Sequence, residues 1–257
     1  MIRYTVVIAQ RDSAVAVSRQ LPDLYDFFDS LAAPLDVIAV DDGSSADSFD
    51  LLEEQILVCP TLRLIRFEQP RGVGYALSAG IAAARGDVVV AIEAGERYPP
   101  SQISKLLDGL VHADLVCAKR PRASGANLWR RAANVTRWVL PASPVDDPGC
   151  LFWAARREAV AGIDLSGGME SYLASLVAAR GFRVDQASVT TRQTKPESSD
   201  TKTSRSEPAD RHWQAGRRKK ADATESCKAG GSGSPIQLEL PPGGDAPVPS
   251  HPPQESA

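Results

Sequence analysis

An apolar run that ends on acids is the first sign of chemistry in this chain. Residues 88–100 read VVVAIEAGERYPP, so Glu93 closes a hydrophobic stretch and Glu96 follows three residues later. Carboxylates at the end of a buried strand often supply oxygen ligands to a divalent cation such as Mg²⁺. Gly95, however, stands where the second acid of an acid-x-acid pair would be. These residues alone are compatible with a metal site, the remains of one, or a turn.

A second group of acids follows an earlier apolar run. In LDVIAVDDGSS, Asp41 and Asp42 come directly after the apolar residues, and Gly43 permits a turn with positive φ. The serines that follow can cap a helix, which is a purely structural use. Because neighbouring side chains in a strand alternate in direction, one of the two acids should point into a crevice. There it could accept a hydrogen bond from a base or a ribose hydroxyl.

A glycine pair opens the next helical segment. In EQPRGVGYALSAG, Gly72 and Gly74 lie at the expected helix start, and Arg71 comes just before them. Unpaired N–H groups at a helix start suit an anion, and Arg71 could contact a phosphate. Close packing of the glycines and a solvated arginine are the structural alternatives.

The last acid pair lies in PASPVDDPGC. Pro148 and Gly149 bend the chain, so this loop could aim Asp146 or Asp147 into a cleft, or it could be an acidic turn. A carboxylate within hydrogen-bond reach of a hydroxyl can act as a general base. Two adjacent acids in an extended segment do not face the same side, so only one of them would serve.

The elements that position these acids alternate between strand and helix. Short apolar runs predict strands, and segments of helical periodicity separate them. The expected strands are YTVVIA, LDVIAVDD, TLRLIRF, DVVVAIE, ADLVCA, GCLFWA and FRVDQASV, and the expected helices cover residues 14–31, 49–58, 72–84, 101–111, 126–140 and 169–179. This order predicts a parallel α/β sheet with helices on both faces. In such sheets ligands bind beyond the carboxyl ends of the strands, where the acids lie.

Taken in order, these motifs resemble glycosyltransferase family 2, which has the GT-A fold and includes dolichyl-phosphate sugar synthases. The resemblance is carried by VIAVDDGSSADS, RGVGYALSAGIAAARGDVVVAIEAGERYPP, ADLVCAKR, VDDPGCLFWAARREAV and ARGFRVDQASVTTR, and it spans about residues 2 to 192. It implies a Rossmann-like, mostly parallel sheet. It also implies an inverting transfer of a sugar from a nucleotide-diphosphate-sugar donor to a hydroxyl or phosphate acceptor that the sequence does not identify.

The resemblance also implies roles for the acids. Asp41 and Asp42 would bind the nucleotide, and Glu93 would be the first acid that holds Mg²⁺ or Mn²⁺. Beside these implied roles, Glu96, one residue after Gly95, is the candidate for a shifted second ligand, and Arg71, Gly72 and Gly74 remain the candidates beside the phosphates. Asp147 would be the base, with Asp146 as the other candidate.

The chain departs from the family pattern at several positions. Gly95 replaces a metal acid, Arg11 and Asp12 stand where the family has a polar pair, and the usual closing Ser-Lys is missing after Arg192. A catalytically degenerate protein that binds a nucleotide sugar, or acts as a scaffold, is therefore the alternative function.

Composition limits the remaining classes. The net charge of −3 over 257 residues does not indicate nucleic-acid binding. The four cysteines form no C-x-x-C pair and are expected as buried thiols. No apolar run is long enough for a membrane helix, and the N-terminus reads as a strand, so a cytoplasmic protein is expected.

Residues 1–192 are expected to form the GT-A domain, and residues 193–257 are expected to be a disordered tail rich in Ser, Pro, Gly and charge. The basic run at 217–220 is interpreted as solvated, and contact with acidic lipid at a membrane surface or with RNA is the alternative.

Overall fold

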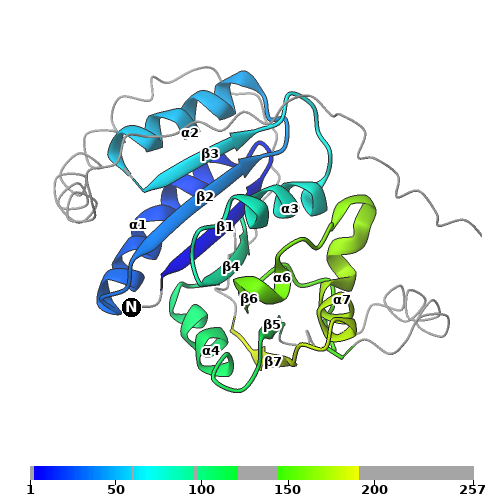
Figure 1. Cartoon of the computed structure of the whole chain (residues 1–257). Helices are drawn as coiled ribbons and strands as arrows, with labels where there is room; N and C mark the ends of the chain where they lie inside the picture. Colours follow the sequence, from blue (N-terminus) through cyan, green and yellow to red (C-terminus); the bar gives the residue numbers. More distant parts are fainter. Residues whose placement is uncertain (1–2, 60, 95–97, 121–143, 191–257) are drawn as a thin grey trace, which may run out of the picture.

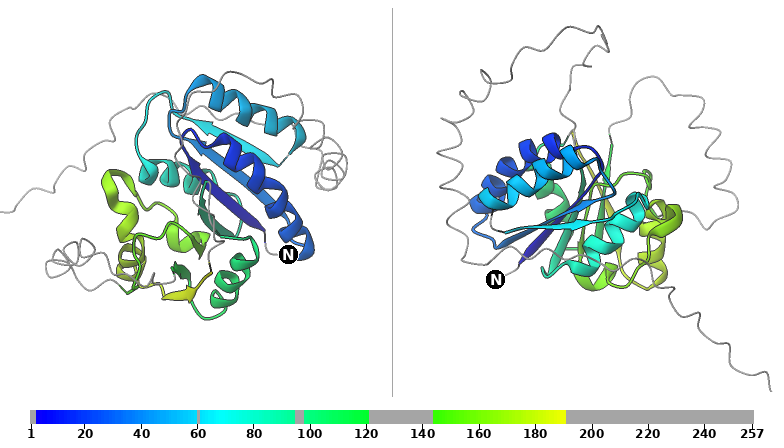
Figure 2. Two further views of the ribbon diagram at one scale, coloured as in Figure 1. Left: turned by 180° about the vertical axis from the view of Figure 1, so that it is seen from behind. Right: turned by 90° about the horizontal axis from the view of Figure 1, so that it is seen from above.

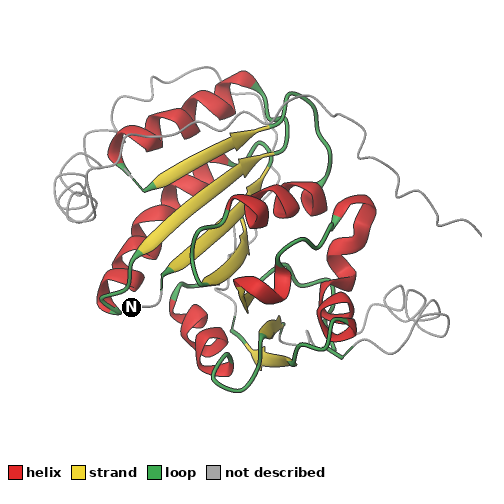
Figure 3. Cartoon of the chain, in the orientation of Figure 1, coloured by secondary structure: helices red, strands yellow, loops and turns green. Residues whose placement is uncertain are grey.

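The computed structural model describes residues 3–59, 61–94, 98–120 and 144–190 (Figure 1). Strands and helices alternate along most of this length, as Figure 3 shows by colour. The elements are β1 (Tyr4–Gln10), α1 (Ala14–Ser30), β2 (Leu35–Asp41), α2 (Ala46–Val58), β3 (Leu62–Arg66), α3 (Val73–Ala83), β4 (Val88–Glu93), α4 (Ser101–Gly109), β5 (Leu115–Lys119), β6 (Trp153–Arg156), α6 (Arg157–Val160), the 3₁₀ helix η2 (Ser166–Tyr172), α7 (Leu173–Ala179) and β7 (Val184–Ser188).

The described strands form one sheet of seven, in the order β3-β2-β1-β4-β6-β5-β7. Its pairs are parallel except those of β6, which runs antiparallel to both β4 and β5. The predicted mostly parallel α/β sheet is therefore confirmed, although the reversed direction of β6 was not anticipated. Because β6 is reversed, its first residue lies at the edge where the parallel strands end.

Helices cover both faces of the sheet, as the view from above in Figure 2 shows. On one face α1, α2 and α4 bury side chains such as Leu21, Leu52 and Leu106 against the strands. On the other face α3, α6 and α7 bury Leu77, Val160 and Val177. Successive strand residues belong alternately to these two clusters, since strand side chains alternate between the faces of a sheet.

Most expected helices lie within a few residues of their predicted bounds. The segment 169–179 differs, because it begins as the 3₁₀ helix η2 before α7. Gly167 and Gly168 have φ values of 65° and 88° there, which an α-helix does not accept. The predicted helix at 126–140 and the predicted tail at 193–257 lie outside the described residues, so the division into two regions stays a prediction.

Two further expectations concern cysteines and membranes. Cys59, Cys117 and Cys150 are buried free thiols, as expected, and Cys227 lies outside the described residues. Within the described ranges, no helix combines the length and apolar character needed to cross a bilayer.

Candidate functional site

The predicted acids lie at one edge of the sheet. Parallel register pairs Gln10 of β1 with Asp41 of β2, and Ala9 with Glu93 of β4. Asp41 and Glu93 are therefore separated by a single intervening strand, about 10 Å at the usual spacing. The loop with Asp147 precedes β6, whose start lies at this same edge. The fold thus gathers acids from distant parts of the chain along the carboxyl ends of its parallel strands.

Asp41 lies at the centre of a buried hydrogen-bond network. Its side chain has no exposed surface, and its Oδ1 accepts hydrogen bonds from Gln10 Nε2 and Ser44 Oγ. Its Oδ2 has no hydrogen-bond partner among the described residues, and Arg66 Nε lies 3.9 Å from it. Burial raises the pKa of Asp41, while hydrogen bonds from Ser44 and the charge of Arg66 oppose the rise. A raised pKa and a buried oxygen that lacks a hydrogen bond among the described residues make Asp41 a candidate functional residue.

Asp42 points to the opposite face of the sheet. Its two carboxylate oxygens accept hydrogen bonds from the backbone N–H groups of Arg71, at 2.6 Å, and Gly72, at 2.9 Å. Asp42 thus holds the loop that enters α3. Of the two acids, Asp41 keeps a carboxylate oxygen without a hydrogen bond, whereas Asp42 is used to fix the loop.

The glycines at the start of α3 have separate structural reasons. Gly72 has φ of 98°, a region that favours glycine. At Gly74, an added Cβ would lie 2.0 Å from the backbone oxygen of Leu165, so a side chain has no room. Arg71 stacks its guanidinium over Tyr75, 3.4 Å from the ring centroid. Their predicted role beside a phosphate remains a prediction.

Asp12 supports the same edge. It has φ of 49°, and its Oδ1 accepts hydrogen bonds from the N–H and hydroxyl of Ser45, just before α2. Its own N–H donates to Ser44 Oγ at 2.8 Å. The two hydrogen bonds from Ser45 lower the pKa of Asp12. Asp12 therefore links the loop after β1 to the start of α2 and helps to hold Ser44 against Asp41.

Glu93 is the last residue of β4 and is exposed. Glu96 and Gly95 lie outside the described residues. Within the described ranges no group of three or more His, Cys, Asp and Glu side chains could hold a metal ion. An exposed carboxylate at this edge still fits a Mg²⁺ or Mn²⁺ site in which diphosphate oxygens and waters complete the coordination, because Mg²⁺ often takes only one or two carboxylates. Glu93 would be one protein ligand in such a site.

The two acids before β6 are both held by cations at the end of β5. Asp147 accepts hydrogen bonds from Arg120 Nε at 2.6 Å and Nη2 at 2.7 Å. Asp146 pairs with Lys119 Nζ and also contacts Gln186 of β7. The loop is thereby fixed to two neighbouring strands.

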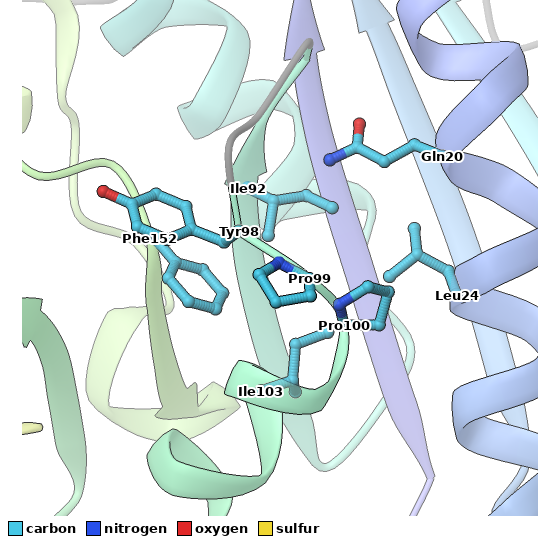
Figure 4. A pocket seen from close by; sticks show the side chains of 8 residues that line it. All are labelled: Gln20, Leu24, Ile92, Tyr98, Pro99, Pro100, Ile103 and Phe152. Carbon is cyan, nitrogen blue, oxygen red and sulfur yellow. The ribbon is translucent and has the colours of Figure 1, made fainter. Parts of the chain in front are cut away.

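Tyr98 connects the segment after β4 to this loop. Its ring stacks on Phe152 with centroids 4.7 Å apart, and its hydroxyl lies 3.8 Å from Cys150 Sγ. Figure 4 shows Tyr98, Pro99 and Pro100 beside a pocket that faces Gln20 and Leu24 of α1. None of the described residues that line the pocket is charged. The pocket therefore lacks the groups that a diphosphate requires.

Sequence reasoning missed several contributors to the site. Gln10, Arg66 and Arg120 were not singled out, because a lone polar residue beside an apolar run carries no pattern. Ser44 was expected only as one of the serines that can cap a helix. The signal that could have found Gln10 is its position as the last residue of a strand next to an acidic strand end.

A comparison with protein families identifies the chain. The family model of glycosyl transferase family 2 matches residues 15–160. The chain belongs to this family. The motifs around Asp41, Glu93 and Asp147 all lie inside the matched range, so the predicted family is confirmed and the chain falls among the glycosyltransferases.

Curated family 2 relatives are similar over about half of this chain. The uncharacterized glycosyltransferase YkcC of Bacillus subtilis is 25% identical over 150 residues, covering 57% of this chain and 46% of that protein. The dolichol-phosphate mannosyltransferase of Pyrococcus furiosus is 26% identical over 159 residues, covering 57% and 45%. The chain spans about half the length of these relatives.

Solved structures confirm the GT-A fold of this family 2 chain. Mannosyl-3-phosphoglycerate synthase from Rubrobacter xylanophilus aligns with a TM-score of 0.59 at 15% identity, covering 89% of this chain and 72% of that one. Glucosyl-3-phosphoglycerate synthase from Mycobacterium tuberculosis, solved with Mn²⁺, UDP and phosphoglyceric acid, aligns at 0.55 and 20%, covering 88% and 78%. At these identities the likeness is one of fold.

Proposed function

We propose that this family 2 chain transfers a sugar from a nucleotide-diphosphate-sugar donor to a hydroxyl or phosphate group of an acceptor, with inversion at the sugar carbon. The observation that carries the proposal is the row of acids along one sheet edge, from Asp41 through Glu93 to Asp147. Relatives named as sugar transferases, among them the dolichol-phosphate mannosyltransferase, support transfer over the alternative of a binding protein without activity. The cytoplasm remains our proposed compartment.

The donor would lie with its nucleotide over β2 and β1. Once the side chains that cover it move aside, Oδ2 of Asp41 would accept a hydrogen bond from a base or ribose, and Gln10 and Ser44 would fix the carboxylate for that contact. Asp42, Arg71, Gly72 and Gly74 would shape the phosphate side, where Asp42 already holds the loop.

The leaving group would be stabilised near β4. Mg²⁺ or Mn²⁺, held by Glu93 and Glu96, would supply a positive charge that stabilises the departing diphosphate. Asp147 would take the proton of the acceptor hydroxyl, and Asp146 is the second candidate for this role. A single displacement of this kind inverts the configuration at the sugar carbon.

Calorimetric titration tests the proposal. UDP, GDP and their sugars are titrated with and without Mn²⁺ into the wild type, Glu93→Ala and Gly95→Asp. We expect binding that Mn²⁺ strengthens and that Glu93→Ala weakens by about 1–3 kcal/mol, the scale of a charge-assisted contact. A metal response found only in Gly95→Asp would favour the degenerate alternative. No binding of any nucleotide would exclude both functions.

A further inference from the structure

The guanidinium of Arg120 donates two hydrogen bonds to the carboxylate of Asp147. Arg120 directly follows β5, and its Nε and Nη2 reach Oδ2 and Oδ1 of Asp147 at 2.6 and 2.7 Å. The backbone N–H of Arg120 also lies 3.4 Å from Oδ2. Two parallel hydrogen bonds from a planar guanidinium fix both the position and the plane of a carboxylate. Asp147 is thus oriented more tightly than a single ion pair would orient it.

The neighbouring acid is held differently. Asp146 meets Lys119, whose ammonium group acts as a point charge on a flexible stem and does not define a carboxylate plane. The side chain of Asp146 is 44% exposed, whereas that of Asp147 is 21% exposed. Lys119 and Gln186 both donate to Oδ2 of Asp146, whereas Arg120 donates to both oxygens of Asp147 and so sets the plane of that carboxylate.

Further contacts hold the loop that carries Asp147. Cys150 N–H donates to the backbone oxygen of Asp147 at 3.2 Å, which closes the turn, and Cys150 Sγ contacts Tyr98. Tyr98 stacks on Phe152, so the loop rests on a buried aromatic pair. The hydrogen bonds to Asp147 raise the pKa of Arg120, which keeps the guanidinium charged.

We propose that Arg120 is the positioning residue that orients Asp147 for proton abstraction, a role that rests on the proposed function. In the transfer step the acceptor hydroxyl gives its proton to Asp147 as its oxygen bonds to the sugar carbon. The bond from that carbon to the diphosphate breaks, and the diphosphate leaves with the electron pair. Arg120 transfers no proton. Oδ2 of Asp147 accepts from both Nε and the backbone N–H of Arg120, whereas Oδ1 accepts one N–H from this arginine and is the oxygen that would take the proton.

A pH–rate comparison of Arg120 variants tests this role. The readout is release of UDP or GDP from UDP-glucose and GDP-mannose, with water as acceptor, for the wild type, Asp147→Asn, Arg120→Gln and Arg120→Lys. We expect Asp147→Asn to lower kcat by about 10²-fold or more. Arg120→Gln should lower it by about 10–100-fold, because misplacing a reacting group by about 1 Å costs up to that much. Donor KM should change less than about twofold.

The pH dependence separates positioning from mere stability. An adjacent cation favours the ionised carboxylate, so the acid limb of the kcat profile should move to higher pH in Arg120→Gln. Arg120→Lys restores the positive charge but not the two parallel hydrogen bonds of the guanidinium. The acid limb of the kcat profile should therefore return to its wild-type pH, while kcat stays low. Arg156→Gln, which removes an arginine paired with Asp114, is the control and should leave the profile unchanged.

Each contrary result overturns a different claim. A wild type that releases no nucleotide overturns the proposed function. An Asp147→Asn variant that keeps its activity overturns the assignment of Asp147 as the base. An inactive Asp147→Asn beside an unchanged Arg120→Gln overturns the positioning role alone. A loss in Lys119→Gln that exceeds the loss in Arg120→Gln also overturns it, because the acid that matters would then be Asp146.

Discussion

At the scale of single residues, Asp41 shows that the site costs stability. Its carboxylate is fully buried, one oxygen has no hydrogen bond among the described residues, and burial raises its pKa above the value near 3.8 expected in the unfolded chain. In the window between these two pKa values the folded chain binds the extra proton, so stability falls as the pH rises through it. The unfavourable contribution is complete above the folded pKa and absent well below pH 3.8.

Replacing Asp41 with Asn should therefore stabilise the fold at neutral pH. The amide oxygen can still accept from Gln10 and Ser44, while the buried charge is removed. We expect a higher Tm than wild type at pH 7, a gain that shrinks as the pH approaches 4, and nucleotide binding weaker by about 1–3 kcal/mol.

Thermal unfolding followed by circular dichroism at several pH values checks the stability, and calorimetry checks the binding. Asp50→Asn, at an exposed position of α2, is the control and should change neither. A gain in Tm that grows toward acid pH would contradict the assigned cause.

At the scale of elements, loops rather than strands set the fine geometry of the site. The turn after β2 passes so close to the loop after β3 that an added Cβ at Gly43 would lie 2.6 Å from the backbone nitrogen of Pro70. Gly43 also has φ of 69°. Close approach and backbone conformation therefore both require glycine here, and the two loops that carry Asp42 and Arg71 are locked together.

Gly43→Ala should destabilise the protein by about 3 kcal/mol, since it adds a steric clash to an unfavourable φ. Gly162→Ala is a matched control, because Gly162 has φ of 70° but nothing within 4 Å of an added Cβ. It should cost only about 1 kcal/mol. Chemical denaturation of both variants measures the difference, and equal losses would show that the contact with Pro70 adds nothing.

The difference between local patterns and contacts made only in the folded sheet explains what the sequence could predict. Apolar runs and helical periodicity predicted the strands through β5, part of β6 and all of β7, together with the helices through α4, because each depends on a local pattern. The direction of β6 depends on how its ends are connected, and no periodicity encodes it. The partner of Asp147 was missed for a related reason, since Arg120 and Asp147 are 27 positions apart and meet only in the folded sheet.

At the scale of the whole molecule, the described core is contained in the predicted first region. Both hydrophobic clusters lie between Tyr4 and Val189. A chain that ends at residue 192 should therefore unfold cooperatively, with a Tm within about 2 °C of the full chain, because a shift of that size corresponds to less than about 1 kcal/mol.

Calorimetry of the two chains measures this difference. A chain that ends at Gly181 is the informative comparison, because it lacks β7, which pairs with β5 at five positions from Val184 to Ser188. It should lose cooperative unfolding. If the chain ending at 192 loses it as well, the tail contributes to the fold and the predicted boundary is wrong.

The alternation of β2 has a final consequence for how this family 2 chain can change. Adjacent acids Asp41 and Asp42 serve opposite layers, one with Gln10 and the other with the loop before α3. Inserting or deleting one residue inside β2 would exchange the faces of the sheet to which Asp41 and Asp42 point. It would also move every following side chain of the strand to the opposite face. The length of β2 is thus as constrained as the identity of its acids. Insertions should be tolerated in connections where no side-chain alternation has to be kept.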